Sequence, residues 1–361
     1  MSIFDNITKI FGNKAGNKVL GIDIGSSSIK IVQLSLKKGV VMLDTFGEIS
    51  LSIYGGKEIG QSVSLDATKI AEALKDLMEA AQTNTAKAAF AIPLKSTLMF
   101  NLKLPKKIEK NKLDDIVRIE ARKYIPVPIS EVQLDWSVLP SLSEEDKNSE
   151  NYNILVVAIH KETLNKYSEI ASINGLETMF REVETFSTIR SVVKYEKNTT
   201  AIVDIGSSVT KFYIIQKGII SKSNIINIGF SKILSRFRGK EKVATDKNEV
   251  NGEAARMLRE SILDISDIPI DLTRIIEEVK KAIISFQKEH HKDITDIVFT
   301  GGGSLFKDIL PYVSKKLSAK VYNADPFSKV VNPAFLDDAL REAGPEFSVA
   351  VGIALRGLKQ F

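Results

Sequence analysis

The stretch VDIGSS at positions 203–208 repeats, with one change, the stretch IDIGSS at positions 22–27. A lysine follows each copy at the same offset, as Lys30 and Lys211, seven residues after the aspartate. From that aspartate to that lysine the two copies agree at six of eight positions. β-Branched and apolar residues precede the glycine, and alternation resumes after the serines, which predicts a strand, a tight turn and a second strand. We therefore expect two equivalent β-hairpins about half a chain apart.

The predicted turns have the composition of a phosphate site. Glycine permits a close approach of the backbone to a ligand, and the residues after it offer N–H and O–H donors to an anion. These residues are Gly25, Ser26, Ser27, Ser28 and Lys30 in the first copy and Gly206, Ser207, Ser208 and Lys211 in the second. A carboxylate next to an anion requires a cation between them, so Asp23 and Asp204 indicate Mg²⁺. One copy alone would suit an ordinary hairpin turn, but the repeat favours a shared ligand.

The composition excludes several classes of protein. The 361 residues include no cysteine, which excludes a disulfide framework and thiol catalysis, and the three histidines have no metal-ligand spacing. The net charge of +5 comes from 50 basic and 45 acidic residues that are mixed along the chain, so nucleic acid is not an expected partner. No apolar run reaches the roughly 20 residues of a membrane span. We expect a cytoplasmic protein of about two domains.

A third glycine cluster follows a predicted strand at 297–300. Gly301, Gly302, Gly303 and Ser304 come next, and an amphipathic helix is expected after them. Bare backbone at a strand-to-helix junction is typical of nucleotide sites. Neither a GxGxxG in a βαβ unit nor a GxxxxGK[ST] occurs, so the Rossmann and P-loop classes do not fit.

The ordered set of a hairpin, a distant second hairpin and a strand followed by three glycines resembles the superfamily of actin, sugar kinases and heat-shock chaperones. The resemblance implies an α/β, actin-like ATPase fold, in which two duplicated ribonuclease H-like lobes hold ATP and Mg²⁺ between them. The segments 183–193 and 345–357 resemble the two connecting helices of that fold, and their small residues predict a close crossing. Glu184 stands where related bacterial actins carry the glutamate that positions the attacking water, with Glu182 as the alternative.

The segment 271–289 is predicted to be a long amphipathic helix. Its apolar stripe consists of Ile275, Ile276, Val279, Ile283 and Phe286. The other face carries Glu277, Lys280 and Lys281, which resemble the acidic and basic pair that contacts ribose and adenine in relatives. A solvated helix surface is the other interpretation of that face.

The segment 86–150 narrows the choice within the superfamily. Two strand-like runs meet at Pro93, a helix follows, and the stretch EARKYIPVP from Glu120 precedes a strand around Leu134 to Val138. This order closely resembles the PilM family of actin-like proteins in type IV pilus assembly, which shares with FtsA a relocated subdomain, 1C, at this point. The resemblance extends from Gly21 to Gly357. One departure is that relatives have two glycines and then a threonine where this chain reads Gly-Phe-Ser-Lys at 229–232.

The resemblance also implies a division into subdomains. We expect an amphipathic segment at 1–18 and a 1A subdomain assembled from 19–85, 151–198 and 336–361. The inserted 1C subdomain is placed at 86–150, and the second lobe at 199–335, with its 2B part at about 230–272. The first segment could lie on a membrane surface or dock on protein.

Members of the PilM family resemble one another in binding the N-terminal cytoplasmic tail of PilN between 1A and 1C. The resemblance therefore implies an ATP-binding scaffold with at most slow ATPase activity, located at the inner face of the cytoplasmic membrane through its partner. Other pilus proteins and ATPases are expected as indirect partners. Candidates for lining a groove for an apolar peptide are Phe90, Leu98, Phe100, Leu102, Ile119 and Tyr124. The alternatives are an FtsA-like or other bacterial actin filament and, less favoured, a small-molecule kinase.

Overall fold

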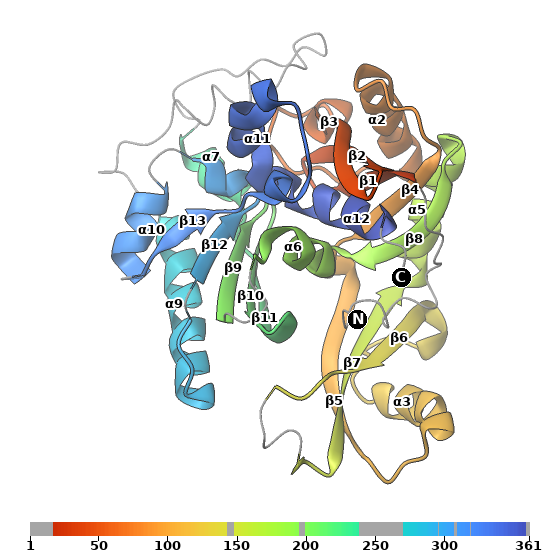
Figure 1. The fold of residues 1–361 in the computed structure, drawn as a ribbon, viewed down its shortest axis with the longest axis vertical. Helices are drawn as coiled ribbons and strands as arrows, with labels where there is room; N and C mark the ends of the chain where they lie inside the picture. Colours follow the sequence, from red (N-terminus) through yellow and green to blue (C-terminus); the bar gives the residue numbers. More distant parts are fainter. Residues whose placement is uncertain are drawn as a thin grey trace.

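A computed structural model describes residues 17–142, 148–194, 199–237, 270–294, 296–306, 309–317 and 319–358. The N-terminal amphipathic segment lies outside the described residues, apart from positions 17 and 18, and so does most of the expected 2B part. Two five-stranded sheets and one three-stranded sheet are present in the described part of the chain. The two large sheets lie in separate lobes, and the small sheet projects from them as an arm (Figure 1).

The first lobe is built on a sheet in which three antiparallel strands are followed by two parallel ones. In sheet order its strands are β3 (Val40–Ser50), β2 (Ser28–Lys37), β1 (Lys18–Ile24), β4 (Lys87–Ile92) and β8 (Glu177–Val183). Its helices are α1 (Leu51–Tyr54), α2 (Ala67–Ala80) and α5 (Lys161–Ile173). The carboxylate of Asp66 accepts a hydrogen bond from Lys69 N at 2.8 Å and caps the start of α2.

The second lobe repeats this arrangement. Its strands, in sheet order, are β11 (Ile219–Ile226), β10 (Thr210–Gln216), β9 (Thr199–Ile205), β12 (Asp296–Thr300) and β13 (Val321–Asn323). Its helices are α7 (Phe230–Phe237), α9 (Ile270–His290) and α10 (Ile309–Leu317). As predicted, α9 buries its apolar stripe, with Ile275, Val279 and Phe286 almost wholly excluded from solvent. The duplicated sheets confirm the predicted α/β fold with two equivalent lobes.

Both predicted hairpins are confirmed, and their register explains the constant spacing of the lysines. β1 and β2 pair antiparallel so that Asp23 lies opposite Lys30. β9 and β10 pair in the same way, with Asp204 opposite Lys211. The seven-residue offset therefore places each lysine directly across the hairpin from its aspartate, where opposite charges stabilise the strand pair.

Two helices cross between the lobes (Figure 1). They are α6 (Glu184–Val192) and α12 (Ser348–Leu358), which a short η10 turn (Gly344–Phe347) precedes; α11 (Asp337–Ala343) lies just before it. A Cβ atom added to Gly352 would overlap the carbonyl oxygen of Ser187, so only glycine allows this crossing. The close crossing that the small residues predict is thus confirmed.

A cluster of buried charges joins these helices to the sheet. The carboxylate of Glu182, at the end of β8, accepts hydrogen bonds from Arg190 at 2.7 Å, Arg356 at 2.9 Å and Ser187 at 2.8 Å. Burial raises the pKa of Glu182, but the two guanidinium groups outweigh it and lower the pKa to about 2. Glu182 therefore joins α6 and α12 to the sheet of the first lobe, and we call this junction the hinge.

The arm differs in its limits from the predicted 1C subdomain. Its sheet has the order β5 (Thr97–Pro105), β7 (Asn151–His160) and β6 (Val132–Val138), and α3 (Leu113–Ala121) covers one face. β4 was expected inside 86–150, yet it is a central strand of the first lobe, and β7 was expected outside and is the central strand of the arm. Both strands are apolar on both faces, so their sequences do not show which sheet they join. The arm runs from about 94 to 160.

Candidate functional site

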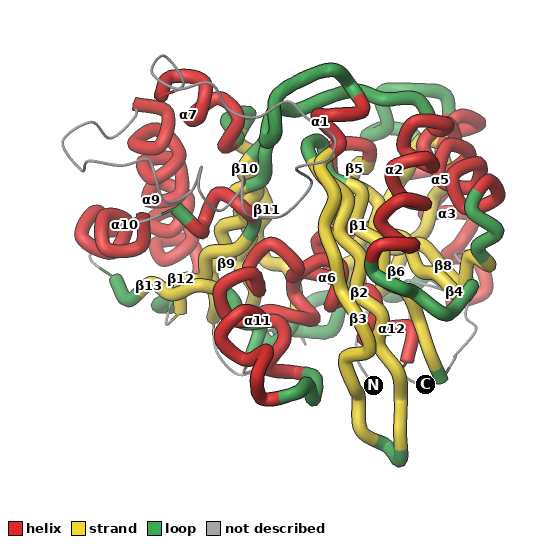
Figure 2. Tube along the Cα trace, turned by 90° about the horizontal axis from the view of Figure 1, so that it is seen from above, coloured by secondary structure: helices red, strands yellow, loops and turns green. Residues whose placement is uncertain are grey.

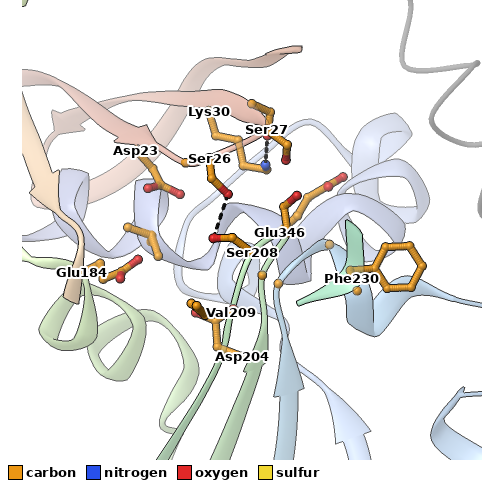
Figure 3. A pocket seen from close by; sticks show the side chains of 18 of the residues that line it. Asp23, Ser26, Ser27, Lys30, Glu184, Asp204, Ser208, Val209, Phe230 and Glu346 are labelled. Carbon is orange, nitrogen blue, oxygen red and sulfur yellow. Dashed lines mark hydrogen bonds between the residues drawn. The ribbon is translucent and has the colours of Figure 1, made fainter. Parts of the chain in front are cut away.

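A cavity of about 420 Å³ lies between the lobes, where the two hairpin turns and the glycine cluster meet. Most of the predicted site residues line it (Figure 3). They are Asp23, Gly25, Ser26, Ser27, Ser28, Lys30, Glu184, Asp204, Gly206, Ser207, Ser208, Lys211, Gly301, Gly302 and Gly303. The structure thus brings together, from both halves of the chain, the residues that the repeated motif marks.

Four predicted residues do not line this cavity. The hydroxyl of Ser304 donates to Gly301 O at 2.8 Å and closes the glycine turn from behind. Glu277, Lys280 and Lys281 are exposed on α9, and Lys281 pairs with Glu278 at 2.9 Å. The three charges lie on an exposed helix face, which agrees with the interpretation as a solvated surface, and none of them lines the cavity.

The two hairpin turns have matching geometry and touch each other. Gly25 N donates to Ser28 O at 2.9 Å, and Gly206 N donates to Val209 O at 3.0 Å. Across the cavity, Ser26 Oγ donates to Ser208 Oγ at 3.1 Å. Hydroxyl groups from both lobes therefore meet in one small volume, where they could donate hydrogen bonds to an anion.

The glycine cluster forms the third wall. Gly301 has φ of +79°, and a Cβ atom there would overlap Asp204 and Ile205, so no other residue fits this turn. At Gly302 a Cβ atom would meet no backbone atom, and its one close neighbour would be the Glu346 side chain, with a carboxylate oxygen at 3.3 Å. The short helix η7 (Gly302–Leu305) follows directly, and the amphipathic helix expected after the glycines is present as α10 (Ile309–Leu317).

The two lysines are held by carboxylates. Lys211 Nζ lies 2.8 Å from Asp204 and 2.7 Å from Glu184. Burial lowers the pKa of Lys211, but the carboxylates of Asp204 and Glu184 raise it well above its usual value. Lys30 Nζ lies 2.8 Å from Glu48, and despite the burial of its ammonium group the negative charges of Glu48 and Glu346 raise its pKa. Both lysines therefore stay charged and can attract an anion.

The carboxyl group of Asp23 has a strongly raised pKa. Burial raises its pKa, the nearby carboxylate of Glu184 raises it further, and Lys30 and Lys211 only partly offset this, which gives a pKa of about 7. A bound cation would relieve the repulsion among Asp23, Glu184 and Asp204, whose side chains point toward one another (Figure 3). Within the described residues no group of three or more acidic or histidine side chains has a metal-ligand arrangement. These residues fit Mg²⁺ only if phosphate and water supply its other ligands, which is how proteins usually bind this ion.

Glu184 and not Glu182 faces the cavity. One oxygen of its carboxylate accepts from Leu94 N at 2.7 Å, and the other accepts from Lys211 Nζ at 2.7 Å. Leu94 is the second residue after β4, where the chain enters the arm. One side chain therefore joins the cavity, the second lobe and the base of the arm.

Some cavity residues were not predicted. Glu48 and Glu346 face the lysine of the first hairpin, and Pro93, Lys95 and Ser96 come from the base of the arm. Phe230 and Phe306 line the second lobe's side, with stacked rings whose centres are 3.6 Å apart. Of these residues, Phe230 stands out in the sequence, because it occupies a position where relatives have the second glycine of a Gly-Gly pair.

The predicted groove residues of the arm divide into two groups. Phe90 is fully buried in the first lobe and Leu102 in the core of the arm, so the prediction that they line a groove is wrong. Leu98 and Phe100 are half-buried, and Phe100 stacks on Tyr124 with ring centres 4.9 Å apart. Ile119 and Tyr124 are 57% and 54% exposed, so their apolar side chains are accessible to a partner.

Comparisons with known proteins agree with this architecture. In the described residues no helix is both long enough and apolar enough to span a bilayer. A solved structure titled as the PilM-PilN type IV pilus biogenesis complex superposes with a TM-score of 0.75 at 20% identity, over 96% of this chain and 100% of that one. Ethanolamine utilization protein EutJ from Carboxydothermus hydrogenoformans superposes with a TM-score of 0.54 at 14% identity, over 97% and 94%. These similarities show the actin-like ATPase fold.

The family comparison goes further than the fold. The family model described as type IV pilus assembly protein PilM matches residues 21–358, nearly the whole chain. The resemblance that the sequence suggests is confirmed over the same range. The chain belongs to the PilM family of type IV pilus assembly proteins.

Proposed function

We propose that this protein is a nucleotide-binding scaffold of the type IV pilus assembly machinery. The observation that carries the proposal is the convergence of two equivalent serine turns, two charged lysines and a glycine turn on one cavity between the lobes. Phosphates would accept hydrogen bonds from the turns, with Mg²⁺ near Asp23 and Asp204. The glycine turn would leave room for the rest of ATP.

Hydrolysis, if it occurs, should be slow. Glu184 would orient the attacking water, but both oxygens of its carboxylate already accept hydrogen bonds from Leu94 and Lys211. The same contacts would couple nucleotide state to the arm, because a shift of Lys211 toward a phosphate weakens its pull on Glu184 and so on the Leu94 amide. The nucleotide would then act as a conformational signal.

The nucleotide site can be tested with Gly302→Val. The new side chain enters the cavity without a backbone clash, so the protein should fold while its ATP affinity falls at least roughly tenfold, about 1.4 kcal/mol. Thermal unfolding with and without MgATP should show a ligand-induced rise for the natural protein and little rise for the variant. Gly39→Asn is the control, because Gly39 has open space around it at the far end of the β2–β3 hairpin. An equal increase in melting temperature on addition of MgATP in all three proteins would contradict this nucleotide site.

We further propose that the arm binds the N-terminal tail of PilN and so places the protein at the inner face of the cytoplasmic membrane. Support comes from family membership and from the exposed apolar pair Ile119 and Tyr124 on the arm. An extended apolar peptide of the Asn-Leu-Leu-Pro type could cover such side chains.

Peptide binding can be measured by fluorescence anisotropy with a synthetic PilN tail. Ile119→Ser combined with Tyr124→Ala should weaken peptide binding roughly tenfold or more, since each substitution removes apolar surface that the bound peptide would cover. Ile173→Ser is the matched control, because Ile173 on α5 is equally exposed, at 53%, outside the arm. Unchanged affinity in the double variant would place the peptide elsewhere. Removal of 86–150 is unsuitable, because it deletes β4 from the first lobe.

Two rival functions make different predictions. A filament protein would form ATP-dependent polymers that sediment at high speed. A small-molecule kinase would release ADP rapidly only in the presence of an acceptor such as a sugar.

A further inference from the structure

The loop from Gly55 to Leu65, which connects α1 to α2 in the first lobe, makes direct contact with the second lobe (Figure 2). We call it the strap. Its Gly60 carbonyl accepts hydrogen bonds from Ser231 Oγ at 2.8 Å and from Ser207 Oγ at 3.3 Å. Its Ser62 hydroxyl lies 3.0 Å from Ser207 Oγ and 3.2 Å from Ser231 Oγ. One short loop of the first lobe is therefore joined to both the second hairpin turn and the start of α7.

The strap is a shaped segment that its own hydrogen bonds hold in place. Ser52 Oγ donates to Gln61 O at 2.7 Å, and Val63 N donates to Ser26 O, in the first hairpin turn, at 2.9 Å. Gly60 has φ of +83°, which favours glycine, and this conformation presents its carbonyl to the second lobe. The preceding Ile59 is buried and lines the cavity. The strap thus connects both hairpin turns and forms part of the cavity wall.

The contacts of the strap are suited to opening and closing. They are neutral hydroxyl and carbonyl hydrogen bonds, each of which changes an equilibrium by roughly 2- to 10-fold. They also compete with a ligand, because Ser26 and Ser207 would each turn a hydroxyl toward a phosphate. Ser62 and Ser231, in contrast, do not line the cavity, and their hydroxyl groups contact each other from opposite lobes.

We propose that the strap controls the exchange of nucleotide by closing the cleft between the lobes through Ser62, Ser231 and the Gly60 carbonyl. This inference rests on the proposed function, since it describes how the same cavity is entered and left. A ligand enters or leaves when the strap separates from α7 and the second hairpin turn. Loss of these bonds therefore speeds both steps and changes the equilibrium affinity much less.

The test is the double substitution Ser62→Ala and Ser231→Ala in the full chain. Stopped-flow fluorescence with a methylanthraniloyl-labelled ATP and Mg²⁺ should show release at least about 10-fold faster than from the natural protein, with a dissociation constant within about 3-fold. The matched control is Ser314→Ala, because Ser314 donates to Ala319 O within the second lobe, away from the cleft. Equal release rates in the double variant and the natural protein would overturn the proposal.

A second measurement without nucleotide separates this proposal from the proposed function. Amide hydrogen exchange should be faster across 55–65 in the double variant, with Val63 N–H the most sensitive position, and unchanged in Ser314→Ala. Unchanged exchange in the double variant would overturn the strap as a closing element even if ATP binds. If the natural protein binds no nucleotide, the proposed function fails and the role in nucleotide exchange fails with it. Faster strap exchange in the double variant would then still show that the loop joins the lobes.

Discussion

Asp23→Asn should raise the melting temperature of the nucleotide-free protein at pH 8 and should remove most of the stabilisation that MgATP gives the natural protein. The two effects have opposite signs because one carboxylate serves both states. Without a cation, the Asp23 carboxylate lies near Glu184 in a buried position, and its pKa is about 7 instead of 3.8. With Mg²⁺ and phosphate present, the same negative charge is needed.

The sign follows from proton binding. Because the folded-state pKa of Asp23 is raised, folded protein holds a proton that the unfolded chain has lost between about pH 4 and pH 7, so stability falls as pH rises through this window. Asparagine carries no charge to bury. We therefore expect the melting temperature of Asp23→Asn to exceed that of the natural protein by roughly 2–6 °C at pH 8, and the difference to disappear near pH 4. Thermal unfolding from pH 4 to 8 measures this, with the exposed Asp338→Asn on α11 as control. An identical pH dependence in Asp23→Asn and the natural protein would contradict the assignment.

Glu182→Ala should destabilise the hinge between the lobes more than any surface substitution. The change leaves Arg190 and Arg356 without the carboxylate that both now contact, in a site where Glu182 is only 5% exposed. Removal of one partner from a buried charge cluster typically costs about 3–5 kcal/mol. The free energy of unfolding from urea titration should fall by that amount, whereas Glu169→Ala on the exposed face of α5 should change it by less than about 0.5 kcal/mol.

The pH dependence gives a second check on Glu182. Its folded pKa of about 2 lies below its ordinary value of 4.5, so the stabilisation is complete above about pH 5 and is lost as pH falls toward 2. Glu182→Ala should therefore show a shallower loss of stability between pH 5 and pH 3 than the natural protein. If Glu182→Ala lowers the free energy of unfolding by less than about 1 kcal/mol at pH 7 and leaves its dependence on pH unchanged, the charge cluster does not stabilise the hinge.

Local patterns predicted the parts of the site that lie within one hairpin or one turn. The repeated motif predicted both hairpins and assigned Asp23, Lys30, Asp204 and Lys211 to one site, and the register then showed why the lysines keep a constant offset. The glycine cluster was recognisable for the same reason, since its positive φ is a local requirement. The helix 271–289 followed from its apolar stripe.

Features that depend on packing between distant segments could not be predicted in this way. The direction of the charged face of α9 depends on how that helix lies on its lobe, so its lysines were assigned to a cavity that they do not line. The strands β4 and β7 are both apolar on both faces, so the sequence did not show which sheet each joins, and the predicted limits of the arm were wrong. The strap could not be predicted from the sequence either, because Gly60 and Ser62 join the lobes only through contacts with the distant residues Ser207 and Ser231.

Isothermal titration of the natural protein with ATP, in excess Mg²⁺ and again in excess EDTA, tests most directly whether the cavity between the lobes is a phosphate and cation site. The account predicts saturable binding of one ATP per chain with Mg²⁺ and at least roughly tenfold weaker binding without it, since the carboxylates that line the cavity, Asp23, Glu184 and Asp204 among them, repel phosphate unless a cation is present. No binding in either buffer, or equal affinity in both, would contradict it.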